Sequence, residues 1–272
     1  MRENPTGDRY ASLFGALSKE NKAIVAFSGG TDSTFLLEVC VKALGAGNVT
    51  AATALSSCRH SREAERAGRT ARRLGVRHIL LHTRELELEQ VRFNRPDRCY
   101  HCKKHLYSVL MRTIKEKGAA GPVLDATTSD EAAAHRPGLK ALNESGIRCP
   151  LVQAGMTKDD VKCVLKDMGL TNEISPEESC LLTRFPYGER VTDIKLRRVR
   201  QAEESLFDMG FSLARVRCHG NAARIELKTE EMPGILVPGI RREILRRFKP
   251  VFRRITLDME GFRSGSMDDP GE

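Results

Sequence analysis

The feature that most constrains the fold is a glycine turn between two apolar segments near the N-terminus. The segment KAIVAF, residues 22–27, has the continuous apolar run of a buried strand, and STFLLEVCVKAL, residues 33–44, has helical spacing. Glycines in the turn between them allow a phosphate to approach the backbone, and the N–H groups at the start of a helix attract anions. The pattern therefore predicts a phosphate-binding loop that joins a strand to a helix.

This turn, SGGTDS, differs from two common nucleotide-binding motifs, because it has neither the lysine of a Walker A loop nor the three spaced glycines of a dinucleotide fingerprint. It resembles instead the PP-loop of the ATP pyrophosphatase superfamily, which includes NAD and GMP synthetases, asparagine synthetase and the tRNA thiolases. The resemblance implies that the loop holds the β,γ-pyrophosphate of ATP, with Mg²⁺ across the phosphates, while an acceptor oxygen attacks the α-phosphorus. The alternative is a tight turn that binds no ligand. The expected contacts come from Ser28, Gly29, Gly30, Thr31, Asp32 and Ser33, with Asp32 also expected to act in catalysis.

Strand-like and helix-like segments alternate through the first part of the chain. The expected strands are residues 22–27, 48–55, 77–83 and 121–128, and the expected helices are residues 33–44, 62–75 and 105–118. This alternation predicts an α/β fold of the Rossmann-like class, a parallel sheet with helices on both faces. In such folds ligands bind at the carboxyl ends of the strands.

The pattern changes after about residue 175. A helix over residues 194–210 is followed by a hairpin over residues 213–227 with Gly220 and Asn221 at its turn, and then by a helix and a closing strand. This order predicts a smaller α+β unit. We expect a PP-loop domain over residues 1–175 and an α+β domain for substrate binding and sulfur transfer over residues 176–272, with the boundary near Pro176 and Pro186.

Charge and hydropathy restrict the partners. The chain has 45 Lys and Arg residues against 36 Asp and Glu residues, a formal net charge of +9. Such a surplus attracts polyanions, whether nucleotides, pyrophosphate or RNA, although a solvated basic surface is the alternative. No stretch approaches the roughly 20 apolar residues of a membrane span, and the opening MRENPTGDRY lacks the apolar run of a secretory signal. We expect a cytoplasmic protein without a membrane partner.

Eight cysteines are present, which in a reducing compartment indicates metal binding or catalysis rather than disulfides. Cys40 and Cys163 lie in apolar helical stripes and are expected in the core. Cys99 and Cys102 form a C-x-x-C ahead of a predicted helix, a spacing that serves a metal, a redox pair or neither. With Cys180 they make three thiols, a number that fits an iron–sulfur cluster better than a four-ligand zinc site.

Several ordered segments narrow the resemblance to the LarE family of ATP-dependent sulfur transferases, which mature the nickel-pincer cofactor of lactate racemase. The similarity extends from about Ala23 to Met267. The segments that carry it are AFSGGTDSTFLL, RPDRCYHCKKHLY, RPGLKAL, SCLLTRFPYGERVT, RVRCHGNAARIEL and GFRSGSM. The resemblance implies that a carboxylate of a pyridinium dicarboxylate mononucleotide is adenylated and that sulfur then displaces AMP to give a thiocarboxylate.

The family offers two sources of sulfur. In one branch a single cysteine, here Cys180, gives up its sulfur and ends as dehydroalanine. In the other branch three cysteines hold a [4Fe-4S] cluster that carries an extra sulfide. Because Cys99, Cys102 and Cys180 are all present, we favour the cluster branch, with ATP, Mg²⁺ and the cluster as cofactors. The two branches exclude one another, since a cluster ligand must survive turnover.

The resemblance also assigns weaker candidates. Arg215 and Arg217 alternate along a strand, face one side, and would bind the substrate's phosphate, unless they are a solvent-facing pair. Glu203 would help to bind a metal ion, and Arg184 would stabilise a thiolate or an adenylate as a catalytic residue. In DATTSDE, where Ala126 and Thr128 replace the family's glycine and asparagine, Asp125 and Asp130 are nucleotide-binding candidates.

The sequence leaves two other functions open. A tRNA thiolase of the same superfamily would explain the basic charge, but no RNA-binding appendage is recognisable, so nucleic acid is not the expected partner. A nucleotide-binding regulatory module would have lost its loop acid or its cysteines, and both are present. We expect a small nucleotide-like carboxylate as substrate, a donor that supplies sulfide, and an assembly of several copies of the chain.

Overall fold

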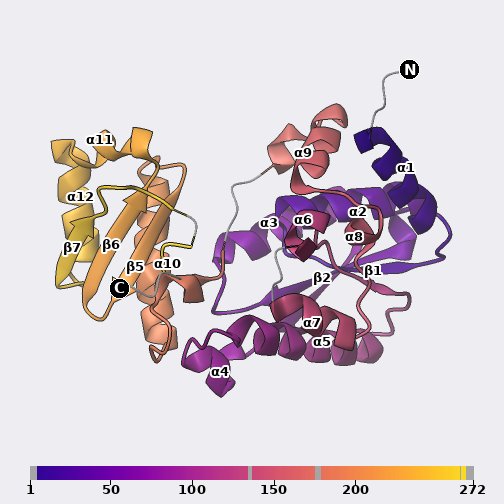
Figure 1. Cartoon of the computed structure of the whole chain (residues 1–272), viewed down its shortest axis with the longest axis horizontal. Coiled ribbons are helices and arrows are strands. Elements are labelled where there is room, and N and C mark those ends of the chain that lie inside the picture. Colours follow the sequence, from indigo (N-terminus) through magenta and orange to yellow (C-terminus); the bar gives the residue numbers. More distant parts are fainter. Residues whose placement is uncertain (1–4, 134–136, 175–178, 264, 268–272) are drawn as a thin grey trace. The chain divides into compact units, whose positions relative to one another are not determined.

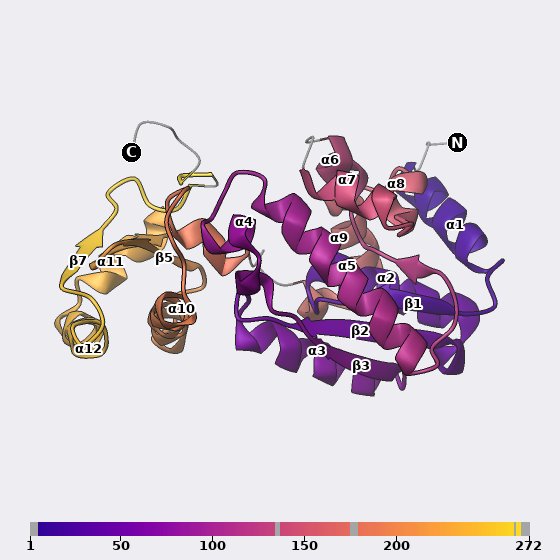
Figure 2. The same ribbon diagram turned by 90° about the horizontal axis from the view of Figure 1, so that it is seen from below.

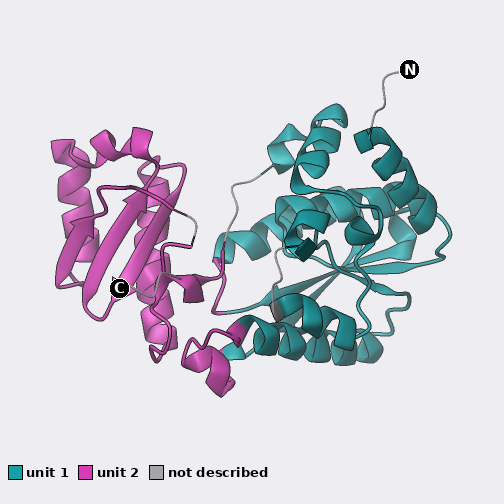
Figure 3. Cartoon of the chain, viewed as in Figure 1, with its two compact units in different colours: residues 1–56, 61–85, 99–178 teal, residues 57–60, 86–98, 179–272 magenta. Residues whose placement is uncertain are grey.

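The computed structural model describes residues 5–133, 137–174, 179–263 and 265–267. The chain forms two compact units, each described by itself (Figure 3). Unit 1 comprises residues 1–56, 61–85 and 99–178, and unit 2 comprises residues 57–60, 86–98 and 179–272. Unit 2 therefore includes two short pieces of chain from within the first hundred residues. The boundary expected after residue 175 lies outside the described residues and stays a prediction.

Unit 1 is built on a four-stranded parallel sheet with the order β3-β2-β1-β4. The strands are β1 (Ala23–Ala26), β2 (Val49–Leu55), β3 (Arg77–His82) and β4 (Val123–Leu124). All four coincide with the segments that the sequence predicts, although β4 is short. The parallel α/β fold is thereby confirmed.

Helices cover both faces of this sheet (Figures 1 and 2). The helices of unit 1 are α1 (Pro5–Leu17), α2 (Thr31–Leu44), α3 (Ser61–Arg73), α5 (Arg98–Glu116), α6 (Ser129–Ala133), α7 (Pro137–Glu144), α8 (Pro150–Gln153) and α9 (Lys158–Asp167). Side chains alternate along a strand, so Val25 packs with α1, α2, α3 and α9 while Ile24 packs with α5 and α7. Burial of these two apolar layers stabilises the unit.

Helix α1 is tied to α9 through a carboxylate. Thr157 and Asp160 form a capping box at the start of α9. The same Asp160 accepts hydrogen bonds from Thr6 Oγ1 and from Arg9 Nη1, at 2.5 and 2.7 Å. Burial would raise the pKa of Asp160, but the hydrogen bonds from Thr6, Thr157 and Arg9 outweigh it and lower that pKa well below its ordinary value.

Two expectations for the cysteines of unit 1 are wrong. Helix α5 starts at Arg98, so the C-x-x-C lies inside the helix and not ahead of it. No proline or glycine follows Pro96 until the end of α5, and nothing in that sequence delays the helix. Cys163 on α9 is exposed, whereas Cys40 on α2 is buried as expected. In α9 the inward positions are taken by Val161, Val164 and Leu165.

Unit 2 has a three-stranded sheet with the order β5-β6-β7. Its elements are α4 (Glu89–Arg92), α10 (Asp193–Asp208), β5 (Ala214–His219), β6 (Ala222–Leu227), α11 (Met232–Ile235), α12 (Pro238–Phe248) and β7 (Arg254–Leu257). Strands β5 and β6 form the predicted antiparallel hairpin, in which Gly220 has φ +60°, and β7 lies parallel to β6. The smaller α+β sheet is thus confirmed. None of the described helices is long and apolar enough to cross a membrane.

The early pieces of chain are integral to unit 2. The side-chain amide of Asn94 donates hydrogen bonds to the carbonyls of Phe185 and Pro186, at 2.8 and 3.0 Å. The N–H of Val191 donates to the carbonyl of Arg92 at 2.7 Å. Asn94 has φ +46°, a left-handed conformation that asparagine tolerates better than most residues. Residues 86–98 therefore contribute backbone contacts that the segment 179–272 cannot supply alone.

Candidate functional site

The glycine loop lies at the carboxyl end of β1. Gly29 has φ +78°, and a Cβ atom there would approach the Glu63 carbonyl oxygen and the Ala67 nitrogen of α3 to 2.8 and 2.9 Å. Only glycine fits both this conformation and this close packing. Helix α2 then starts at Thr31, with Asp32 in its first turn. Backbone groups at a helix N-terminus and in a glycine turn suit the binding of phosphate oxygens.

Two serines hold the loop together. Ser28 Oγ accepts a hydrogen bond from the Gly30 N–H at 3.2 Å and lies 3.0 Å from Ser33 Oγ. Ser33 Oγ also contacts the Gly30 carbonyl oxygen at 3.0 Å. The predicted nucleotide-binding residues 28–33 thus form one turn that is closed by its own side chains. Their contact with ATP remains a prediction.

Arg66 is a residue at this loop that the sequence does not reveal. It lies on α3, and its Nε donates to the Gly29 carbonyl oxygen at 2.5 Å. This bond joins α3 to the loop at the residue whose conformation requires glycine. The helical pattern predicts α3 but carries no signal for this contact, because the two residues are distant in sequence.

Of the two loop aspartates, Asp125 comes directly after a strand of the sheet, where a ligand is expected. It follows β4, which pairs with β1, so it lies at the same edge of the sheet as the glycine loop. Its carboxylate accepts hydrogen bonds from Tyr107 Oη and from the Thr127 N–H. These bonds fix the orientation of Asp125 at the position where α/β folds bind ligands.

Asp130 has a structural contact instead. It is exposed, on α6, and its Oδ1 accepts a hydrogen bond from the Lys158 N–H at the start of α9, at 3.2 Å. Burial acts to raise the pKa of Asp130, but its hydrogen bonds outweigh this effect and lower the pKa. A negative charge at a helix N-terminus is stabilising. The geometry favours a helix cap over the predicted nucleotide contact.

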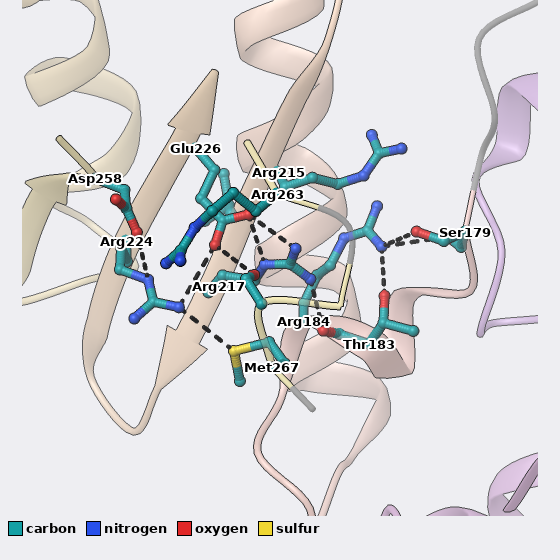
Figure 4. Close-up of polar contacts among 12 residues, drawn as sticks. Ser179, Thr183, Arg184, Arg215, Arg217, Arg224, Glu226, Asp258, Arg263 and Met267 are labelled. Carbon is teal, nitrogen blue, oxygen red and sulfur yellow. Dashed lines mark hydrogen bonds and ion pairs between the residues drawn. The ribbon is translucent and has the colours of Figure 1, made fainter. Parts of the chain in front are cut away.

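In unit 2, Arg184 contacts Ser179 and Thr183 (Figure 4), which flank Cys180 in the sequence. It is fully buried in the short 3-10 helix Leu181–Arg184. Its Nη1 donates to Ser179 Oγ and Thr183 Oγ1, both at 2.6 Å. Its Nε donates to Glu203 Oε1 at 2.7 Å. These contacts engage the guanidinium with protein groups, which favours a positioning role, and the predicted catalytic role of Arg184 stays a prediction.

Glu203 is a buried hub on α10. Besides Arg184, its carboxylate contacts His60 Nε2 at 2.9 Å and accepts the Val216 N–H at 2.8 Å. Burial would raise the pKa of Glu203, but the charge of Arg184 and the hydrogen bonds of Arg184 and His60 lower it far below the ordinary value. The carboxylate is therefore ionised, and its oxygens are occupied by protein donors. A metal ion at Glu203, as predicted, would have to compete with them.

Arg215 and Arg217 lie on β5, and both are buried, so they are not a solvent-facing pair. Arg217 Nε donates to Glu226 Oε2 at 2.9 Å, and its Nη1 donates to the Thr183 carbonyl at 2.8 Å (Figure 4). The Arg215 guanidinium lies over the ring of Phe262, 5.4 Å from its centroid. Glu226, on β6, is a residue that sequence reasoning missed. It neutralises part of the predicted phosphate site.

The three predicted cluster ligands are divided between the units. Cys99 is exposed and Cys102 is half-buried, and both lie on α5, where residues three apart share one face. Cys180 is half-buried and belongs to unit 2. Among the residues that the structure describes, no three His, Cys, Asp or Glu side chains are gathered as a metal site.

Cys180 has a thiol neighbour within unit 2. The Leu181 N–H donates to the Cys58 carbonyl at 2.9 Å, and the Cys58 thiol forms a side-chain hydrogen bond with Cys180. This hydrogen bond, with the positive charges of Arg59 and Arg98, lowers the pKa of Cys180 to about 7 in spite of its burial. A substantial fraction is then thiolate at neutral pH. The sequence gives Cys58 no role, because it lies outside every recognised motif.

Comparison with known proteins agrees with the glycine loop. Residues 22–91 match the family described as queuosine biosynthesis protein QueC. The chain is 37% identical over 262 residues to pyridinium-3,5-bisthiocarboxylic acid mononucleotide synthase of Lactiplantibacillus plantarum, covering 96% of this chain and 94% of that protein. It is 36% identical over 262 residues to an uncharacterized protein of Synechocystis, covering 96% of both chains. An uncharacterized protein of Methanocaldococcus jannaschii is 31% identical over 68% of this chain and 71% of its own length.

Proposed function

The chain belongs to the LarE family of ATP-dependent sulfur transferases, and from this premise we propose its substrate. The enzyme adenylates a carboxylate of pyridinium-3,5-biscarboxylic acid mononucleotide and replaces AMP with sulfur, which gives a thiocarboxylate for a nickel-pincer cofactor. The observation that carries the proposal is the identity of 37% with the bisthiocarboxylic acid mononucleotide synthase over 96% of the chain. A match of this length favours a small-molecule substrate over tRNA.

The activation step uses the edge of the sheet in unit 1. The Gly29–Gly30 backbone and the start of α2 would hold the β,γ-phosphates of ATP, since both present N–H groups. Asp125, fixed by Tyr107 and Thr127, would contact the nucleotide or its Mg²⁺. Mg²⁺ offsets the charge of the phosphates when bound. Pyrophosphate then leaves from the loop that bound it.

The sulfur step uses unit 2. Arg184 and Glu203 fix the turn that presents Cys180, and the Cys58 hydrogen bond favours its thiolate. Arg215 and Arg217 on β5 would bind the substrate's monophosphate. The hydrogen bond from Arg217 to Glu226 would fix the orientation of the Arg217 guanidinium. Planar guanidiniums bind phosphate through paired hydrogen bonds.

The proposal includes a [4Fe-4S] cluster, because thiolates are the ligands that such clusters require. Cys99 and Cys102 share one face of α5, and Cys180 is the third thiol, with a lowered pKa that suits metal ligation. When bound, such a cluster would supply an iron position for the transferred sulfide. The alternative is consumption of Cys180 itself.

One experiment tests both levels of the proposal. Full-length protein is reconstituted anaerobically with iron and sulfide and then incubated with ATP and the mononucleotide. We expect pyrophosphate, AMP and a product in which sulfur replaces a carboxylate oxygen, over many turnovers, with an intact protein mass. C180S should lose the thiocarboxylate product, and C163S, which changes an exposed cysteine on α9, should retain it.

The outcomes separate the alternatives. A single turnover that converts Cys180 to dehydroalanine would replace the cluster with sacrificial sulfur donation. A colourless protein whose metal content is zinc would also exclude the cluster. Absence of pyrophosphate release with this substrate, together with thiolation of tRNA, would overturn the proposed substrate class.

A further inference from the structure

Cys58 carries a buried thiol to which the proposed reaction assigns no role. It follows β2 in sequence but belongs to unit 2, and only 2% of its surface is exposed. Its carbonyl accepts the Leu181 N–H at 2.9 Å, so the Cys58 backbone lies against the residue next to Cys180. Two cysteines from distant parts of the chain are thus neighbours at the position expected to handle sulfur, and Cys58 lowers the pKa of the Cys180 thiol.

The Cys58 side of this contact is held firmly. On one side of Cys58, the Ser57 carbonyl accepts a hydrogen bond from Arg200 Nη2 at 2.5 Å. On the other side, His60 Nε2 contacts Glu203 Oε2 at 2.9 Å. Both partners lie on α10. The four-residue piece 57–60 is therefore fixed to unit 2 at both ends.

The Cys180 side is fixed as well. The Cys180 carbonyl accepts hydrogen bonds from Thr183 Oγ1 at 2.8 Å and from Arg184 Nη1 at 3.3 Å. Arg184 reaches the same Glu203 carboxylate that His60 contacts. One buried ion-pair network thus positions both cysteine backbones. Such an arrangement holds a thiol next to its partner sulfur and gives the pair a high effective concentration.

We propose that Cys58 is the resolving thiol of Cys180 and that the pair forms a dithiol site for sulfane sulfur in the cluster-free protein. This inference rests on the proposed role of Cys180 as the sulfur-handling thiol. When an organic persulfide or a polysulfide has transferred its outer sulfur to Cys180, the Cys58 sulfur attacks the Cys180 sulfur. The bond between Cys180 and the outer sulfur breaks, and a Cys58–Cys180 disulfide forms.

The step is balanced in atoms and electrons. The outer sulfur leaves as hydrosulfide with the bonding electron pair, and the Cys58 proton passes to it or to water. The sulfane sulfur is reduced and the two thiols are oxidised to the disulfide. A low-molecular-weight dithiol then reduces this disulfide by exchange. If the outer sulfur already bears the acyl group of the substrate, the same attack releases the thiocarboxylate in place of hydrosulfide.

The test uses the full-length chain, freed of iron, reduced, and then loaded with inorganic polysulfide. After rapid removal of the excess, hydrosulfide release is followed, and peptide mass spectrometry locates persulfides and disulfides. The unchanged chain should release hydrosulfide and acquire a Cys58–Cys180 disulfide. In C58S the release should slow by about tenfold or more, with the persulfide retained on Cys180.

C218S is the matched control, since Cys218 is also buried in unit 2 but is hydrogen-bonded to the Gly220 carbonyl. It should behave like the unchanged chain. Equal hydrosulfide release by C58S, or a disulfide between Cys180 and any other cysteine, would overturn the inference. Disulfide mapping in the unchanged chain keeps the test valid if C58S folds poorly.

The assay contains neither ATP nor a cluster, so its failure can be told apart from failure of the proposed function. Normal hydrosulfide release without any thiocarboxylate synthesis would count against the proposed function alone. Thiocarboxylate synthesis without the Cys58–Cys180 disulfide would count against this inference alone.

Discussion

The glycine loop of unit 1 and the Cys180 turn of unit 2 position polar groups in opposite ways. The loop is one contiguous segment, residues 28–33, and it presents backbone groups. The Cys180 turn depends on Arg184, Glu203 and His60, which come from three separate parts of the chain and are all buried. The first site requires glycine at position 29 and is closed by the side chains of its own serines. The second requires that every charge keep its partner.

The largest expected effect is in the buried network. Glu203→Gln leaves Arg184 buried without a counter-charge, and removal of one partner from a buried ion pair costs about 3–5 kcal/mol. The free energy of unfolding of the variant, measured by urea denaturation, should fall by that amount. The control is Glu243→Gln on α12, which pairs with Arg246 and Arg247 at the surface, where solvent screens ion pairs, so the free energy of unfolding should change far less. Equal losses in the two variants would remove the contrast between the sites.

The glycine loop should respond to a single methyl group. Gly29→Ala forces a side chain into φ +78° and against the backbone of α3, which costs about 1–3 kcal/mol. ATP binding, measured calorimetrically, should weaken about tenfold or more, because the loop must shift. The control is Gly15→Ala on α1, where a Cβ meets no atom within 4 Å and helix propensity improves. If Gly29→Ala binds ATP normally, the loop is not the nucleotide site.

A smaller effect with a pH signature is expected at Asp160. Its pKa is lower in the folded protein than the ordinary value of about 3.9, so its contribution to stability is full at neutral pH and is lost as pH falls below about 4. Asp160→Asn should lower the free energy of unfolding by about 1 kcal/mol at pH 7. The variant should also lose less stability than the unchanged protein as the pH falls. Thermal unfolding between pH 3 and 7 measures this. An equal loss of stability at low pH in both proteins would contradict this role of Asp160.

The smallest expected effect is at Arg66. Arg66→Met removes one hydrogen bond to the Gly29 carbonyl, worth about 1 kcal/mol. The KM for ATP should rise about fivefold with little change in kcat. Arg69→Met, on the same helix, is the control and should leave the KM unchanged. A fall in kcat alone would show that Arg66 acts on the chemical step.

The same contrast explains how far the sequence could predict the structure. The four parallel strands and the β5–β6 hairpin follow from local periodicity and turn residues, and all are confirmed. The glycine loop is equally local. The start of α5 is one local feature predicted wrongly, although Asp97, a residue type that favours the N-cap, directly precedes the helix.

The remaining contacts join residues that are distant in sequence. Cys58 beside Cys180, Arg66 on Gly29, and Glu226 on Arg217 each depend on how separate elements pack. Spacing predicts that Arg215 and Arg217 share a face of the strand. It cannot show that the carboxylate of Glu226 is already hydrogen-bonded to Arg217. Side-chain pairing of this kind is decided by tertiary packing, which single-sequence periodicity does not encode.

The interleaving of the two units along the chain affects how the protein is made. Residues 57–60 and 86–98 leave the ribosome long before residues 179–272, with which they pack. The nascent α/β unit must therefore carry these unfinished pieces until translation is nearly complete. A gene fragment that encodes only the last segment would lack them, so a truncated C-terminal product should be a poor substitute for the natural unit.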